Sequence, residues 1–151
     1  MSREKNHFDL LIKNGTIYTA LETFKADIAV KDEKIIAIGQ NLGNAKRIIN
    51  ADGMLVLPGG IDAHCHIEQE SSNRIMTADD FYSGSVSAAF GGNTSFLPFA
   101  AQHRGQSLRE VVGTARDRAH SKSVIDYGLH LIISDPSEKV LEEELPSLIK
   151  E

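Results

Sequence analysis

Two histidines separated by a single residue are the feature of this sequence with the clearest chemical meaning. His64 and His66 lie in the segment 58–66, which reads PGGIDAHCH. Alternate side chains of an extended strand point to the same side, so both imidazoles would be presented on one face. Two neutral imidazoles in that arrangement can each give one nitrogen to a zinc ion, at about 2.0–2.1 Å. We therefore predict that His64 and His66 are metal ligands.

The residues beside this pair have different expected roles. Asp62 falls on the same face, one step deeper, where it can orient an imidazole from behind and tune the basicity of that ligand. Cys65 faces the opposite side and is not expected to bind metal. A His-x-His pair is weak evidence on its own, and the alternative interpretation is two hydrogen-bonded core histidines.

The elements that must position the histidines favour metal binding. From Pro58 onward, strand-like and helical runs alternate three times, which predicts right-handed parallel βαβ units and an α/β fold. The first strand then ends at the histidines, and the C-terminal ends of such strands carry the chemistry of barrel enzymes. Strands are expected over 60–67, 93–99 and 124–133, and helices over 77–90, over 107–119 and from 135 onward with an interruption at Pro146.

Polar residues and glycines mark the expected helix boundaries. Thr77 and Ser107 each precede an acidic residue by three positions, a capping-box pattern that predicts a helix N-terminus. Gly91 and Gly92 are expected to end the first helix. The acidic run 142–144 is interpreted as a solvated helix face.

Residues 1–57 have a different sequence pattern, with short β-like runs separated by turns. The turns are expected at 14–15, 31–34 and 52–53, of which the first is Asn-Gly and the last Asp-Gly. These dipeptides favour tight hairpins because the turn positions require positive φ. We therefore predict an antiparallel β-sandwich segment over 1–57, followed by a second domain over 58–151.

The second domain is too short to be a complete barrel. A (β/α)₈ barrel needs ~250 residues, whereas the whole chain has 151. The segment after Pro58 therefore predicts the first three βα units of a truncated (β/α)₈ barrel.

Composition excludes several classes of function. The net charge of −5 provides no basic surface for nucleic acid. No apolar run approaches the ~18 residues that a membrane span requires, and the polar start lacks the apolar region of a secretory signal. One cysteine cannot form an internal disulfide. These features lead us to expect a cytoplasmic protein.

Three further segments make a family resemblance specific. Together with the histidine segment, the chain resembles the dihydropyrimidinase and D-hydantoinase family of the amidohydrolase superfamily, in order and along its whole length. The segments are GIDAHCHIE at 60–68, MTADDFYSGS at 76–85, GQSL at 105–108 and DYGLH at 126–130.

The resemblance implies a site with two zinc ions, of which His64 and His66 bind the more buried one. The remaining ligands of such a site come from later strands: a carboxylated lysine, two histidines and an aspartate that also moves the proton. Lys150 lies too early to be that lysine. The resemblance therefore places no catalytic residue within this segment, and we expect the 151-residue chain alone to be inactive.

The implied reaction is hydrolysis of the cyclic amide bond of dihydropyrimidines or hydantoins to N-carbamoyl amino acids, with a homotetramer as the implied assembly. Glu68, Gln69 and His103 are candidates for loops that contact the cyclic ureide substrate, and a solvated loop is the alternative for each. His130 is expected to be hydrogen-bonded rather than metal-bound. An allantoinase-like or dihydroorotase-like enzyme, or a non-catalytic scaffold relative, remains an alternative function.

Overall fold

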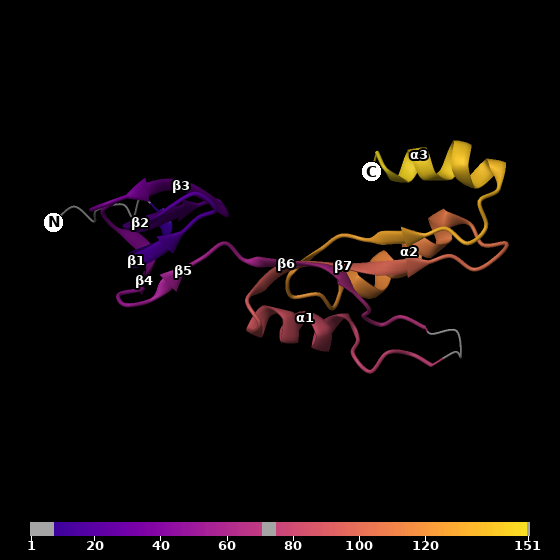
Figure 1. Ribbon diagram of the computed structural model, residues 1–151, viewed down its shortest axis with the longest axis horizontal. Coiled ribbons are helices and arrows are strands. Elements are labelled where there is room, and N and C mark those ends of the chain that lie inside the picture. The colour runs from indigo at the N-terminus through magenta and orange to yellow at the C-terminus, as the bar shows by residue number, and fades with distance from the viewer. Residues whose placement is uncertain (1–7, 71–74, 151) are drawn as a thin grey trace. The chain divides into compact units, whose positions relative to one another are not determined.

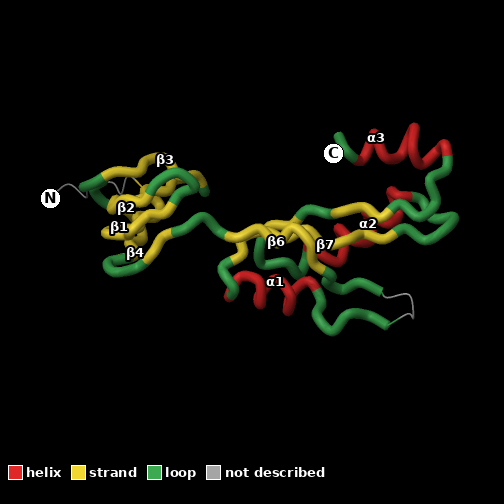
Figure 2. Tube along the Cα trace, in the orientation of Figure 1, coloured by secondary structure: helices red, strands yellow, loops and turns green. Residues whose placement is uncertain are grey.

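The computed structural model describes residues 8–70 and 75–150, which form two compact units, Met1–Pro58 and Gly59–Glu151 (Figure 1). The first unit holds only strands among its described residues, whereas the second alternates strands with helices (Figure 2). None of the described helices is long and apolar enough to cross a membrane.

The first unit is built on a mixed sheet, not the antiparallel one expected. β1 (Phe8–Tyr18) pairs antiparallel with β2 (Thr23–Lys31), which pairs antiparallel with β3 (Lys34–Gly39). β4 (Ala45–Asn50) and β5 (Leu55–Val56), however, both pair parallel with β1. The antiparallel prediction is therefore wrong for these two strands, because the chain crosses from β3 to the other edge of β1 instead of folding back in a hairpin.

Asn14 and Gly15, expected to form a hairpin turn, instead form a bulge within the continuous strand β1. The pairing of β1 with β2 shifts between Ile12 and Gly15, and Asn14 has a φ of 63°. The backbone N–H of Asn14 donates to the buried carboxylate of Asp27 at 3.0 Å, which satisfies both groups. A Cβ on Gly15 would lie 2.6 Å from the Val56 side chain, so glycine permits close packing of β5 here.

The Asp52–Gly53 segment turns the chain but joins no hairpin. The backbone N–H of Met54 donates to the Ala51 carbonyl at 2.9 Å, which closes a tight turn between β4 and β5. Both strands then continue along the same edge of β1, on either side of its bulge. The other expected turn, at 31–34, does join the antiparallel strands β2 and β3.

The second unit has the expected alternation of parallel strands and helices. β6 (Gly60–Cys65), β7 (Asn93–Ala101) and β8 (Asp126–Tyr127) lie in that order, and β9 (His130–Ile132) also pairs with β7. All of these pairings are parallel. α1 (Phe81–Phe90) connects β6 to β7, and α2 (Leu108–His120) connects β7 to β8 (Figure 1). The third strand, expected to be continuous, is broken into β8 and β9.

The boundaries of α1 and α2 are largely as expected, with one displaced cap. Ser107 caps α2 through its hydroxyl, and Gly91 ends α1. The cap of α1 is Asp80, not Thr77: its carboxylate accepts from the Ser83 N–H at 2.9 Å, and the Ser83 hydroxyl accepts from the Asp80 N–H.

The last helical segment differs from its prediction in two ways. It consists of a π-helical turn, Val140–Glu144, that leads into α3 (Leu145–Leu148). Pro146 therefore lies at the start of an α-helical segment instead of interrupting one, because a first-turn residue needs no N–H donor.

Glu144 is buried, so the prediction of a solvated acidic face is wrong at this residue. Its carboxylate accepts from the Leu108 N–H at 2.7 Å and from the Ser107 hydroxyl at 3.1 Å. Burial would raise the pKa of this carboxyl, but these hydrogen bonds and nearby Lys139 outweigh it and keep the pKa below its usual range. Glu144 therefore provides a second cap at the N-terminus of α2.

The core of the second unit lies between the sheet and its helices. Phe81, Phe96 and Ala119 are buried together, and Cys65 and Ile67 pack against them. A Cβ on Gly84 would lie 2.9 Å from the end of the Ile67 side chain, so this helical glycine lets α1 approach the exit of β6 closely. The core therefore fixes α1 against the segment that carries the histidines.

Two phenylalanines of this unit make a matched test of the core. Phe96 is 0% exposed and Phe90 is 91% exposed. We expect Phe96→Ala to lower the free energy of unfolding by about 3–5 kcal/mol, because it leaves a cavity. Phe90→Ala should change it by no more than about 0.5 kcal/mol. Urea unfolding followed by circular dichroism measures both, and equal losses would contradict this description of the core.

Candidate metal centre

His64 and His66 are brought together at the exit of β6. Their ring centroids are 5.3 Å apart with an interplanar angle of 75°, and both side chains are exposed. β6 ends at Cys65, so His66 is the first residue beyond the strand. Within the described part of the chain, no group of three or more His, Cys, Asp or Glu residues is placed to hold a metal ion. Two adjacent, accessible imidazoles fit part of a zinc ligand set, but not a complete one.

An aromatic ring that the sequence interpretation missed supports the pair. Phe99 on β7 lies 4.6 Å from the His64 ring and 5.1 Å from the His66 ring, between centroids, and is nearly parallel to the latter at 15°. Phe96, Pro98 and Ala100 are buried, which leaves Phe99 on the opposite face of the strand. This alternation was the available signal that Phe99 shares a face with the histidines.

His130 also belongs to this aromatic group. Its ring centroid lies 5.0 Å from that of Phe99, and its Nε2 lies 2.9 Å from the carbonyl oxygen of Ala63. The expected hydrogen bond is therefore present, and it links β9 to the backbone of β6.

Asp62 and Cys65 flank the two histidines. In the described part of the chain, neither makes a hydrogen bond to a ring nitrogen of His64 or His66. The Asp62 carboxylate accepts from the backbone N–H of His64 at 3.1 Å, so it holds the backbone at the point where the register of β6 and β7 shifts. Cys65 packs toward the core on the other side. Burial raises the pKa of the Cys65 thiol to about 11, and the Asp62 charge adds to the effect. The thiol therefore stays protonated near neutral pH.

Gln69 makes a direct hydrogen bond with a histidine of the pair. Its Oε1 lies 2.7 Å from Nδ1 of His66. The backbone of Gln69 is held in turn by Thr77, whose hydroxyl accepts from the Gln69 N–H at 3.1 Å and whose N–H donates to the Gln69 carbonyl at 3.0 Å. The helix cap expected of Thr77 is thus replaced by a role in the loop.

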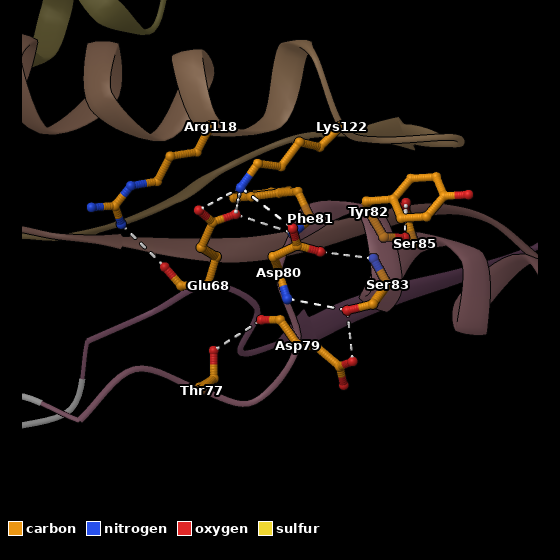
Figure 3. A network of polar contacts seen from close by, with 10 residues as sticks. All are labelled: Glu68, Thr77, Asp79, Asp80, Phe81, Tyr82, Ser83, Ser85, Arg118 and Lys122. Carbon is orange, nitrogen blue, oxygen red and sulfur yellow. Dashed lines mark hydrogen bonds and ion pairs between the residues drawn. The ribbon is translucent and has the colours of Figure 1, made fainter.

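Glu68 connects the histidine strand to both helices (Figure 3). Its carboxylate pairs with Lys122 at 2.8 Å and accepts from the Phe81 N–H at 3.2 Å, and its side chain is only 16% exposed. Its carbonyl accepts from the Arg118 guanidinium at 3.1 Å. The Glu68 side chain therefore contacts the start of α1 and Lys122, two residues beyond the end of α2, which anchors the backbone before Gln69.

The charges around Glu68 shift the titration of their neighbours. The hydrogen bond to Glu68 raises the pKa of Lys122, which also lies 3.4 Å from the Asp80 carboxylate. The hydrogen bond from the Ser83 N–H lowers the pKa of Asp80, and Lys122 lowers it further. Lys122 and Asp80 are therefore held in their charged forms.

The three residues expected in substrate-contacting loops line one cleft. Glu68, Gln69 and His103 border a space of about 470 Å³, together with Arg118 and Glu110 of α2. His103 is exposed, and its backbone N–H donates to the Gln106 side chain at 3.0 Å. His64 and His66 are not among the residues that line this cleft.

The mixed sheet, followed by parallel βα units with paired imidazoles at the exit of the first strand, has counterparts among known proteins. A family model described as the urease alpha-subunit, N-terminal domain, matches residues 1–62. D-hydantoinase of Geobacillus stearothermophilus is 45% identical over 142 residues, which cover 93% of this chain and 30% of that protein.

Solved structures agree with this similarity. A D-hydantoinase structure superposes with a TM-score of 0.87 at 48% identity, over 93% of this chain and 31% of that one. The dihydropyrimidinase of Brevibacillus agri gives a TM-score of 0.86 at 42% identity, over 92% and 30%. Over this stretch the chain is similar to D-hydantoinases and dihydropyrimidinases, the family that its sequence resembles. It spans about 30% of the length of the curated relative described above.

The lowered pKa of Asp80 gives a pH-dependent prediction. A carboxyl whose pKa is lowered by folding stabilises the fold above its ordinary pKa, and this contribution is lost as the pH falls through the lowered value. We expect Asp80→Ala to lower the Tm by a few degrees at neutral pH. The difference from the unsubstituted protein should shrink as the pH falls below the ordinary value of 3.8.

Thermal unfolding followed by circular dichroism over this pH range provides the measurement. Asp117→Ala, at an exposed position of α2, is the matched control and should change the Tm little at any pH. A difference between Asp80→Ala and the unsubstituted protein that stays constant into acid would contradict the assigned role of Asp80.

Proposed function

We propose that the protein containing this chain hydrolyses the cyclic amide bond of dihydropyrimidines or hydantoins, which yields N-carbamoyl amino acids. The observation that carries the proposal is the pair His64 and His66, 5.3 Å apart between ring centroids at the exit of the first parallel strand. The supporting similarity is 45% identity to a D-hydantoinase over 142 residues. The substrate is therefore a small cyclic ureide.

The proposed architecture extends what the structure describes. Residues 1–57 form one part of a β-sandwich, and residues 58–151 form the first three βα units of a (β/α)₈ barrel. The parallel order β6, β7, β8 supports the barrel, since parallel sheets are covered by helices and placed centrally in their domains. Ile61 of β6 is 66% exposed and alternates onto the same face as Cys65, which is consistent with a further helix covering this face.

His64 and His66 are proposed to hold zinc, with two ions per site in the whole protein. Zinc bound there would supply an activated water and polarise the amide carbonyl, the two requirements for cleaving a poor electrophile. Asp62 fixes the backbone N–H of His64, and Phe99 stacks on one face of the His66 ring. The proton-transfer residue is not proposed to lie in this segment.

The cleft beside α2 is proposed to contribute to substrate recognition. Gln69 and His103 border it with polar side chains. Glu68 borders it as well, but its carboxylate is occupied by Lys122 and the Phe81 N–H. Oε1 of Gln69 is bonded to His66, so we assign the direct polar contacts with substrate to the side-chain NH₂ group of Gln69 and to His103, and assign Glu68 to holding the loop.

The assembly and location follow from the same proposal. The protein is proposed to be a cytoplasmic homotetramer with no nucleic-acid or membrane partner. The net charge of −5 supports the absence of a nucleic-acid partner.

Histidine substitutions test the proposed function in the complete protein. His64→Ala and His66→Ala should each lower kcat/KM for dihydrouracil or hydantoin by more than about 100-fold. Changes to residues that only support a metal ligand already cost about 10–100-fold. His120→Ala, at an exposed position at the end of α2, is the matched control and should retain activity. Cleavage of allantoin or dihydroorotate in preference to both substrates would favour the alternative enzymes.

The 151-residue chain by itself is expected to be inactive. It offers two imidazoles at the site and no third ligand in its described part. Two ligands bind zinc weakly and cannot complete a catalytic centre. Hydrolysis of dihydrouracil by the purified chain, above that of its His64→Ala variant, would show that this expectation is wrong.

A further inference from the structure

We infer that Gln69 is a positioning residue that sets the tautomer and orientation of His66, so that Nε2 of this ring is the metal-binding atom. The inference rests on the proposed metal site. It assigns to Gln69 a role toward His66 in addition to its place in the cleft.

The hydrogen bond selects one tautomer of the ring. A neutral imidazole has one protonated nitrogen, which donates, and one unprotonated nitrogen, which accepts or binds metal. Oε1 of Gln69 can only accept, and it lies 2.7 Å from Nδ1 of His66. The proton is therefore held at Nδ1, and the lone pair remains at Nε2.

The ring is held on its face as well as at its edge. Phe99 stacks on His66 with an interplanar angle of 15° and 5.1 Å between centroids. With Nδ1 bonded to Gln69 and one face covered by Phe99, rotation about the side-chain bonds is restricted. A ligand ordered before metal arrives loses less conformational freedom on binding.

Gln69 itself rests on a rigid support. Thr77 bonds both the N–H and the carbonyl of Gln69. Glu68, the preceding residue, has a φ of 46°, which is uncommon for a residue other than glycine. Its N–H donates to the Asp79 carbonyl at 2.9 Å, and Lys122 and Arg118 hold its carboxylate and carbonyl (Figure 3). The network around Glu68 therefore fixes the position of the Gln69 backbone, from which the side chain extends toward His66.

The test compares three glutamine variants of the protein. Gln69→Leu removes the acceptor at similar size, whereas Gln69→Glu retains an oxygen acceptor. Gln40→Leu, at an exposed position of the first unit, is the matched control. Histidine tautomers are read by magic-angle-spinning NMR of metal-free, ¹⁵N-histidine-labelled protein, a method that does not depend on particle size. Zinc affinity is measured by competition with a chromogenic chelator.

We expect His66 to be protonated at Nδ1 in the unsubstituted protein, in Gln69→Glu and in Gln40→Leu. In Gln69→Leu the two tautomers should mix, and zinc affinity should fall about 10- to 100-fold. Gln69→Glu should bind zinc within a few fold of the unsubstituted protein.

The outcomes separate this inference from the proposed function. An unchanged tautomer and unchanged zinc affinity in Gln69→Leu would overturn the role of Gln69 while leaving the metal site intact. If the unsubstituted protein binds zinc no better than its His64→Ala variant, the metal site is wrong, and the tautomer spectra still decide whether Gln69 orients His66.

Discussion

The ion pair between Glu68 and Lys122 joins segments that lie 54 positions apart in the sequence, and the arrangement around the histidines depends on it. The chain must leave β6 with a left-handed turn at Glu68, and the carboxylate of that residue meets the start of α1 and the end of α2 at one point. The attraction within a half-buried ion pair offsets the free-energy cost of removing both charges from water only when other hydrogen bonds satisfy the remaining lone pairs. The Phe81 N–H provides such a hydrogen bond to Glu68. The loop that contacts His66 is therefore set by the packing of two helices.

Local sequence signals predicted those features that depend on neighbouring residues. The shared face of His64 and His66, the Ser107 cap and the end of α1 at Gly91 all follow from short-range geometry. The Asn14–Gly15 prediction was wrong because a positive φ serves a bulge as well as a turn, and only the partner strand distinguishes them. The parallel pairing of β4 and β5 with β1 was missed for a similar reason, since contacts between residues distant in the sequence determine which edge a strand joins.

The candidate site shows the same division. Phe99 was missed although strand alternation could have placed it on the face of the histidines. Nothing local indicated that Gln69 would reach back to His66 or that Glu68 would pair with Lys122. A run such as Glu68-Gln69-Glu70 has the composition of a solvated loop, and its buried member is identified only by the helices that pack against it. The sequence alone therefore located the two histidines better than it located the residues that hold them.

The buried carboxylate of Glu144 has a consequence for the order in which the protein can be completed during synthesis. Helix α2 begins at Leu108, yet the group that accepts the hydrogen bond of its first N–H lies 36 positions later. As the chain emerges from the ribosome, the N-terminus of α2 lacks this acceptor until Glu144 has been synthesised. The carboxylate of Glu68, just beyond β6, likewise lacks its ion-pair partner until Lys122 has been synthesised, 54 positions later. Each of these two contacts is thus completed by a later βα unit, so the structure of one unit is finished only after the next has been synthesised.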